Sequence, residues 1–522
     1  VARRLAALSR MDAAIAAQRA AVEFAPSTRR KLELGAMLLA AGDLAGAEAV
    51  YADAAREAPR DFDAQRGLGK VYAAAGKHAD AARAFGTALQ LRPDHADTAF
   101  EVGRALNALG QHFAALPVFE AALAQEPQDA AGHAAYADAL AGAGRRDDAL
   151  VELRRATELA PKTQAFHRRL GEVLSTLGRT GEAVAAFAAA VELAPDDAAS
   201  QRGLGLSLAG EGEHERALEA LSAAVTLGAQ DGGLSVGMGT SLYHLDRFGE
   251  ARDWLNAARH QAPNDIEARY YLGLTSLALN DHARAKAELE AAIAAKPEEP
   301  RYLVGHGRVL EAEKQPAQAV GGYARAAEVA PAYAPAHAEA ARVYLALGMP
   351  AEAEVHFAKL AELGDDVEVL LGLARAREDR GAYAEAVAPL AKVVRLRPDD
   401  VELRQRYARA LSGAGRLDAA VDALKEAMQV APAPARVAAQ LAEACREADR
   451  AFDLVDALVE ARDRHPDDAT LRTLLAEAYR DAERLDDALR EAQAAVDKDA
   501  GARGAWALLG RLRYRLQGTL ER

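Results

Sequence analysis

The sequence predicts an all-α protein, an α-solenoid of stacked helix hairpins, and three observations support this fold class. Hydrophobic residues make up 51% of the 522-residue chain but aromatic residues only 5%, so the apolar content is mostly Ala, Leu and Val. Such small side chains suit helices that pack closely against each other. Val, Ile and Thr form no alternating runs of the kind that indicate an extensive sheet. The third observation is the regular spacing of the prolines.

Prolines mark the chain at intervals of about 34 residues, or about twice that where one mark is skipped. The series is Pro26, Pro59, Pro93, Pro127, Pro161, Pro195, Pro263, Pro297, Pro331, Pro398, Pro432 and Pro466. The skipped marks fall on Ala229 and near Asp365, beside Gly228 and Gly364. A proline ends a helix because the residue before it disfavours the helical region. The spacing therefore indicates a tandem array of similar units.

Each unit carries the same pattern of small and large residues when its proline is given position 32. In residues 62–95, position 8 is Gly69, position 20 is Ala81 and position 24 is Phe85. A glycine at position 15, here Gly76, divides the unit in the middle. Two apolar stripes at helical spacing on either side of a glycine predict a helix hairpin. One hairpin cannot bury both of its faces, so neighbouring hairpins must stack into a solenoid.

These residues resemble the tetratricopeptide repeat. The unit 62–95 holds most of the family's pattern, namely Leu68, Gly69, Tyr72, Ala81, Phe85, Ala88 and Pro93. The resemblance covers residues 28–500 as fourteen consecutive repeats, and it implies a right-handed superhelix. It specifies the fold much more closely than the function, because the family serves many partners.

The two ends of the chain are predicted to differ from the array. Residues 1–27 fit a partial N-terminal repeat, mainly its second helix, and Val1 and Ala2 fit the interior of its first helix. We therefore expect the native chain to continue upstream. Residues 501–522 fit a single capping helix, because the polar surface of such a helix shields the end of the stack from water.

Composition and motifs argue against several classes of function. The formal net charge of −14 disfavours binding to nucleic acid. The single cysteine, Cys445, excludes an internal disulfide and a cysteine-based metal site, and its place in the repeat predicts an inert core thiol. No apolar run is long enough to span a bilayer. The chain is thus expected to bind no nucleic acid and to carry no transmembrane segment.

Motifs of catalysis and of cofactor binding are not found in the sequence. The glycines of Gly203-Leu204-Gly205 lie inside a predicted helix with no strand before them, so they are interpreted as packing residues. His133, His167 and His337 recur at position 4 of their units, too far apart to share one metal ion. We therefore expect a non-enzymatic protein with no catalytic residue, no metal and no cofactor.

A row of arginines is the first candidate for a partner-binding site. In the tetratricopeptide family the first helix of each repeat lines the concave groove, and position 9 points into it. That position is arginine in four consecutive units, at Arg308, Arg342, Arg375 and Arg409. Stacked guanidinium groups suit the carboxylates of an acidic partner segment. Alternatively, each arginine pairs with an acid of the same groove, such as Glu311, Glu339, Glu368, Glu378 or Glu402.

An aromatic and apolar stretch in the middle repeats is the second candidate. The predicted partner-binding residues there are Tyr243, His244, Tyr270, Tyr271 and Leu274. An exposed patch of this kind usually marks a binding surface. The alternative is that some rings pack between helices, as Tyr271 does if it follows the neighbouring Leu272 and Gly273 into the core.

These features predict a non-enzymatic scaffold that holds a partner protein or an extended peptide in the concave groove. The length and composition of the array suggest an assembly factor of a bacterial multiprotein machine. Two alternatives stay open, namely the substrate-binding arm of a larger glycosyltransferase-like enzyme and the periplasmic region of a polysaccharide export or secretion system. The cytoplasm is the favoured compartment and the periplasm the alternative, and the oligomeric state is left open.

Overall fold

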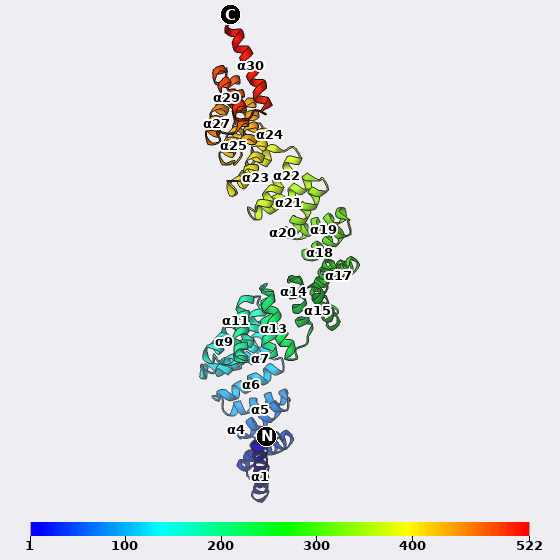
Figure 1. Ribbon diagram of the computed structural model, residues 1–522. Helices are drawn as coiled ribbons and strands as arrows, with labels where there is room; N and C mark the ends of the chain where they lie inside the picture. The colour runs from blue at the N-terminus through cyan, green and yellow to red at the C-terminus, as the bar shows by residue number, and fades with distance from the viewer. Residues whose placement is uncertain (1, 521–522) are drawn as a thin grey trace. The chain divides into compact units, whose positions relative to one another are not determined.

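The computed structural model describes residues 2–520, and that part of the chain forms thirty α-helices and no strand. The all-α prediction is therefore confirmed. The helices belong to two compact units, which meet in the sequence between Leu279 and Asn280 and are described separately. Within each unit, successive helices pack against each other in chain order as stacked hairpins (Figure 1).

The N-terminal unit contains α1 (Ala2–Phe24), α2 (Thr28–Ala40), α3 (Leu44–Glu57), α4 (Phe62–Ala74), α5 (His78–Leu91), α6 (Ala96–Ala108), α7 (His112–Gln125), α8 (Ala130–Gly142), α9 (Arg146–Leu159), α10 (Gln164–Thr176), α11 (Thr180–Leu193), α12 (Ala198–Gly210), α13 (His214–Thr226), α14 (Gly232–His244), α15 (Phe248–Gln261) and α16 (Ile266–Ala278). The C-terminal unit contains α17 (His282–Ala295), α18 (Pro300–Ala312), α19 (Pro316–Val329), α20 (Ala334–Ala346), α21 (Pro350–Leu363), α22 (Val367–Asp379), α23 (Tyr383–Leu396), α24 (Val401–Gly413), α25 (Leu417–Val430), α26 (Ala435–Glu447), α27 (Ala451–Arg464), α28 (Ala469–Asp481), α29 (Leu485–Lys498) and α30 (Arg503–Leu520).

The first helix differs from the sequence prediction. Residues 1–27 were expected to hold the end of one helix followed by a second, but α1 runs without interruption from Ala2 to Phe24. The position that is glycine in many other units is Ser9 here. Because no glycine favours a turn at this place, the helix continues through it. At the other end, α30 packs on α29, where a capping helix was predicted.

The turn between the two helices of a hairpin has a left-handed backbone at position 15. Gly76 has a φ of 70° and Gly415 a φ of 71°. In five repeats this position is not glycine, yet φ still lies between 57° and 62°. These residues are Asp246, Asn280, Lys314, Asp449 and Glu483. A side chain is disfavoured in this conformation relative to glycine. The hairpin geometry therefore imposes the turn even where the sequence lacks its usual residue.

Close contact between position 8 and position 24 builds the core of each hairpin. A Cβ atom added to Gly69 on α4 would lie only 2.5 Å from the ring of Phe85 on α5. The ring of Tyr51 lies between two first helices, and Cβ atoms added to Gly35 and Gly67 would approach it to 2.6 and 2.2 Å. Protein interiors leave no room for such atoms. The glycines thus allow the backbones of successive first helices to approach opposite edges of one large side chain.

In nine repeats the side chain at position 4 ties the first helix to the end of the preceding repeat. His167 Nε2 lies 2.8 Å from the carbonyl oxygen of Pro161, to which it donates. The same contact, six residues back along the chain, is made by Gln65, His133, Gln201, Arg269, His337, Arg404, Arg472 and Trp506. The accepting carbonyl lies beyond the helix end and has no intrahelical donor. The recurring histidines at position 4 are therefore donors that hold the junction between repeats.

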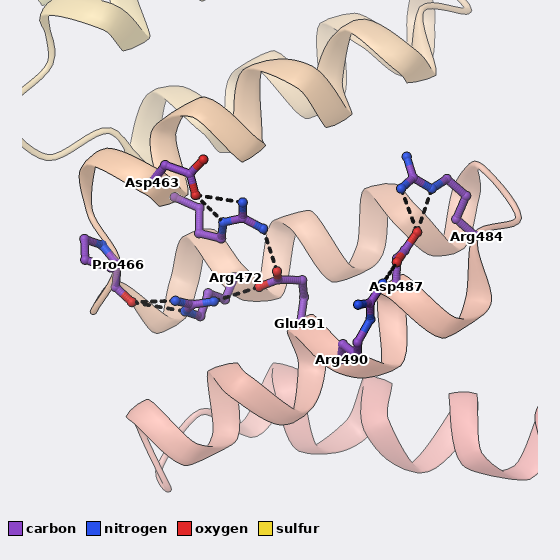
Figure 2. A network of polar contacts seen from close by, with 8 residues as sticks. Asp463, Pro466, Arg472, Arg484, Asp487, Arg490 and Glu491 are labelled. Carbon is purple, nitrogen blue, oxygen red and sulfur yellow. Dashed lines mark hydrogen bonds and ion pairs between the residues drawn. The ribbon is translucent and has the colours of Figure 1, made fainter.

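Figure 2 shows this junction at Arg472 on α28. Its Nη2 donates to the Pro466 carbonyl oxygen at 2.8 Å, and its Nη1 donates to Glu491 Oε2 on α29 at 2.9 Å. Glu491 Oε1 accepts from Arg462 Nη1 on α27 at 2.7 Å. One carboxylate, with a side chain only 14% exposed, thereby connects three helices. Charge-assisted hydrogen bonds of this kind are stronger than neutral ones.

A histidine pair replaces this cation–carboxylate pair in one repeat. Glu491 stands at position 23, and in the repeat of His337 that position is His356. His337 Nε2 lies 3.1 Å from the Pro331 carbonyl oxygen and must donate to it, so His337 Nδ1 accepts from His356 Nδ1 at 3.0 Å. Burial and the neighbouring His337 lower the pKa of His356. The lowered pKa favours the neutral form of His356.

The first prediction concerns the glycine at position 8. The substitution Gly69→Ala should lower the free energy of unfolding by about 1–3 kcal/mol, because the new methyl group overlaps the Phe85 ring. Gly86→Ala on α5 is the matched control, since no atom lies within 4 Å of its added Cβ and alanine raises helix propensity by up to about 1 kcal/mol. Urea denaturation followed by circular dichroism measures both. Equal effects of the two substitutions would contradict this packing model.

The second prediction concerns pH. Because the folded chain binds a proton at His356 less tightly than the unfolded chain does, stability should fall as the pH drops below about 6.5, the ordinary histidine pKa. His356→Gln and His356→Asn should both remove this part of the pH dependence, because neither replacement side chain titrates. Melting temperatures between about pH 5 and 8 test this. Identical slopes for the three proteins would show that the pair does not titrate as described.

Candidate partner-binding site

The four predicted arginines lie at position 9 of α18, α20, α22 and α24, but their surroundings differ. Arg308 Nε donates to Glu339 Oε1 at 3.0 Å. Arg342 Nη2 donates to Glu311 Oε2 at 2.6 Å and to Glu339 Oε2 at 2.9 Å. Although burial opposes it, the hydrogen bonds from both arginines lower the pKa of Glu339. Both arginines therefore pair with glutamates within the protein, which is the alternative that the sequence left open.

The other two arginines have weaker partners or none. Arg375 Nε lies 3.8 Å from Asp379 Oδ2 on its own helix, and its side chain is 66% exposed. Arg409 is exposed, and among the described side chains, those of residues 11–515, none lies within hydrogen-bonding or ion-pairing distance of it. Exposed ion pairs contribute little, so Arg375 is also available to a ligand. The row thus contains two arginines engaged with internal acids and two that can meet a partner.

Positions 6 and 12 explain this difference. Arg308 is paired by Glu339 at position 6 of the following repeat, and Arg342 by Glu311 at position 12 of the preceding repeat. The equivalent partners of Arg409 are a neutral glutamine, Gln440, and a glutamate, Glu378, that Arg406 already engages. The sequence therefore contained the signal, which lies at positions 6 and 12 and not in the arginine row itself.

Two adjacent hollows flank Arg409 on α24. The hollow toward α22 has a volume of about 460 Å³ and is bordered by Asp379 and Tyr383. The hollow toward α26 has a volume of about 230 Å³ and is bordered by Glu443 and Glu447. Arg409 lines both of them. A single guanidinium group without an internal partner thus stands between two openings on the face of the first helices.

The predicted aromatic residues form one cluster in the N-terminal unit. The ring centroid of Tyr243 lies 5.6 Å from that of Tyr271 and 5.3 Å from that of His244. Tyr270 and Tyr271 are in edge contact at 5.1 Å. His244 is exposed and the three tyrosines are half-buried. The rings therefore stabilise one another by edge contacts and still present part of their surface.

Two residues correct the sequence-based account of this cluster. Leu274 is only 6% exposed, so the expectation that it contacts a partner is wrong, and it belongs to the core. His214, which the sequence pattern did not single out, stacks on His244 with centroids 4.4 Å apart and planes 6° apart. Burial lowers the pKa of both histidines, so both are neutral near pH 7. His214 comes from a second helix, α13, at position 17 of its repeat, and the recurrence of histidine there at His78, His112 and His282 is the signal that could have revealed it.

The single cysteine, a candidate for a reactive group, lies in the core. Cys445 is 1% exposed, and burial raises the pKa of its thiol to about 11. Among residues 2–520, no group of three or more His, Cys, Asp and Glu side chains is placed to hold a metal ion. In that same part of the chain, no helix has both the length and the apolar character needed to cross a membrane.

The third prediction follows from the burial of Cys445. At pH 8 the folded protein should react with iodoacetamide roughly a hundredfold more slowly than an exposed thiol, because so little thiolate is present. The same protein in guanidinium chloride should be labelled at the ordinary rate. Intact mass measured over time follows both reactions. Fast labelling of the folded chain would contradict the buried placement.

Comparison with protein families identifies the repeat. Two family models, both described as tetratricopeptide repeat, match the chain. One matches residues 32–94, 66–130, 135–198, 169–233, 267–335, 339–401 and 455–503, and the other matches 208–272 and 378–444. The chain therefore belongs to the tetratricopeptide repeat family. Such a repeat array is a protein–protein interaction scaffold, and its partners are proteins or peptides.

Solved structures of similar proteins were also found. A thermophilic TPR protein of Thermus thermophilus is 28% identical, and the match covers 34% of this chain and 98% of that one with a TM-score of 0.27. PilF of Pseudomonas aeruginosa is 22% identical over 38% of this chain and 91% of that one, with a TM-score of 0.33. The APC/C hetero-tetramer Cut9-Hcn1 matches at 15% identity over 94% and 97% of the two chains, with a TM-score of 0.32. No curated protein sequence matches the chain.

Proposed function

We propose that this protein is a non-enzymatic scaffold that holds an extended segment of a partner protein on the first helices of its C-terminal unit. An acidic stretch of that segment contacts Arg375 and Arg409. The observation that carries this proposal is the exposed guanidinium group of Arg409, which lacks an internal partner and borders two hollows. Carboxylates are the natural partners of such a group.

The contrast within the arginine row supports the choice of these two residues. A ligand carboxylate at Arg342 would compete with Glu311 and Glu339, which are already bound at 2.6 and 2.9 Å. At Arg375 the competitor is an exposed aspartate 3.8 Å away, and Arg409 has none among the described side chains. The acidic segment should therefore gain most binding free energy by contacting Arg375 and Arg409. Arg308 and Arg342 mainly link their own helices.

The aromatic cluster of the N-terminal unit is proposed as a second, separate contact for a partner. Its rings concentrate in one place in a chain where aromatic residues are only 5% of the total. Aromatic side chains on a protein surface often carry much of the energy of binding. Tyr243, His244, Tyr270 and Tyr271 are the proposed anchors, and Leu274 supports them from the core.

The wider role that we propose is assembly of a bacterial multiprotein machine. The length of the array supports this role, because a long series of repeats offers several binding faces at once. The Ala- and Arg-rich composition supports a bacterial setting. In this role the charges of the groove contribute specificity and association rate more than affinity.

The fourth prediction tests the acidic contact. The double variant Arg375→Glu/Arg409→Glu should recover its partner from a native cell extract at least tenfold less well than the unaltered array, a loss of about 1.4 kcal/mol. Arg325→Glu/Arg395→Glu is the matched control, because it changes the charge equally on exposed positions of the second helices α19 and α23. Quantitative mass spectrometry of the captured proteins measures the ratio.

The control should retain the partner, and both variants should keep the helicity of the unaltered protein. Partner recovery that is equal for all three proteins would mean that binding does not use this face. Equal losses in both variants would show an effect of net charge alone.

A further inference from the structure

The hollow between α24 and α26 is lined by polar side chains that have no side-chain partner among the described residues. Helix α24 contributes Gln405, Arg409 and Ser412, and α26 contributes Gln440, Glu443 and Glu447. Ala408, Leu424 and Ala444 form its apolar wall. The residues on each helix are three, four or seven positions apart, so each set lies on one face. Two polar helix faces therefore enclose one small hollow of about 230 Å³.

Two amide side chains line this hollow and form no hydrogen bond with the described side chains. Gln405 is only 7% exposed, and within residues 2–520 its side chain has no hydrogen-bonding partner. The Oε1 atom of Gln440 is buried and likewise has no partner there. Buried polar groups in proteins are nearly always hydrogen-bonded, because leaving one unpaired is costly. Gln405, which lines the hollow, can therefore gain a hydrogen bond from a donor on a ligand.

The charges in the hollow indicate the sign of that donor. Glu443 and Glu447 are both exposed and lie on the face of α26, whereas Arg409 is the one cation among the residues lining the hollow. Neither glutamate forms an ion pair within 4.0 Å with any part of the described chain. Two carboxylates and one guanidinium leave a net charge of −1. A carboxylate alone would meet more repulsion than attraction here, whereas a cation is favoured.

The neighbouring repeats show what is unusual about this place. Between α18 and α20 the equivalent gap is bridged by the ion pairs of Arg308 with Glu339 and of Arg342 with Glu311. Between α24 and α26 the equivalent positions hold Arg409, Gln440, Glu443 and Ser412, and no ion pair among the described side chains bridges the hollow. The gap is thus open to a side chain from outside.

We propose that this hollow binds a basic side chain of the partner segment, with arginine preferred to lysine. The inference rests on the proposed function and specifies the chemistry of its ligand. The guanidinium group donates to the carboxylates of Glu443 and Glu447 and to the side-chain amide oxygen of Gln405, and its aliphatic stem packs on the apolar wall. Arginine is preferred because its planar group offers five donors to several acceptors, whereas lysine offers one compact charge.

This assignment also specifies the pattern of the segment. Arg409 borders the same hollow and would repel a second cation unless a carboxylate lies between them. The acidic residue that contacts Arg409 in the proposed function supplies this carboxylate. The partner segment therefore carries an acidic residue and an arginine within a few positions of each other.

The experiment uses the full chain and a displayed library of random twelve-residue peptides. Selected peptides are synthesised and titrated by calorimetry into the unaltered protein, into Glu443→Gln/Glu447→Gln and into Arg409→Glu. The matched control is Glu477→Gln/Asp481→Asn, because these acids occupy the same two repeat positions on α28. Each peptide is also made with its arginine replaced by lysine or glutamine.

The expected result is a set of peptides with arginine close to Asp or Glu. Their Kd should rise at least tenfold in Glu443→Gln/Glu447→Gln and less than twofold in the control. Replacing the peptide arginine by glutamine should weaken binding to the unaltered protein by a similar factor, and it should have little further effect on the Glu443→Gln/Glu447→Gln variant. Lysine should give an intermediate Kd.

The remaining outcomes separate this inference from the proposed function. Peptides that lose affinity in Arg409→Glu but contain no basic residue, or that bind Glu443→Gln/Glu447→Gln normally, would overturn the basic-side-chain site and leave the acidic contact standing. Peptides that are insensitive to both variants, or a library that yields no binder, would overturn both.

Discussion

The contact between a helix backbone and one large side chain is the constraint on which the rest of the structure depends. Tyr51 shows it most clearly, since Gly35 contacts one edge of its ring and Gly67 of the next repeat contacts the opposite edge. The ring thereby sets the separation of successive first helices. The same arrangement recurs at Phe187, which contacts Gly171 of its own repeat and Gly203 of the next, so these neighbouring repeats stack in the same way.

Because similar repeats stack on one another, residues at the same repeat position lie in a row on the surface. Position 9 becomes such a row, and its chemistry then depends on which residues stand at positions 6 and 12 of the adjoining repeats. Glutamates there bind Arg308 and Arg342 internally. A glutamine and an already engaged glutamate leave Arg409 to a ligand. The same backbone thus provides either a structural ion pair or a binding position.

The junctions between repeats depend on a second recurring contact, the donor at position 4. Helix ends leave carbonyl groups without partners, and this donor satisfies one of them at each of nine junctions. Its identity varies among glutamine, histidine, arginine and tryptophan, because the contact needs only one N–H group in the right place. Where arginine takes this position, as at Arg472, it also engages a carboxylate of the second helix.

The sequence by itself determined the fold class, the repeat and the place of the row, because small and large residues recur at helical spacing with a period set by the prolines. It could not reveal that position 15 is left-handed at Lys314 as well as at Gly76, since that turn is imposed by the hairpin and not by its own residue. Nor could the arginine row alone show which of its arginines lack a close ion pair within the protein. That depended on whether groups more than twenty residues apart, such as Arg406 and Glu378, meet in space. Tertiary structure decided the binding site because ion pairing and burial are properties of neighbours across helices, which a linear pattern does not contain.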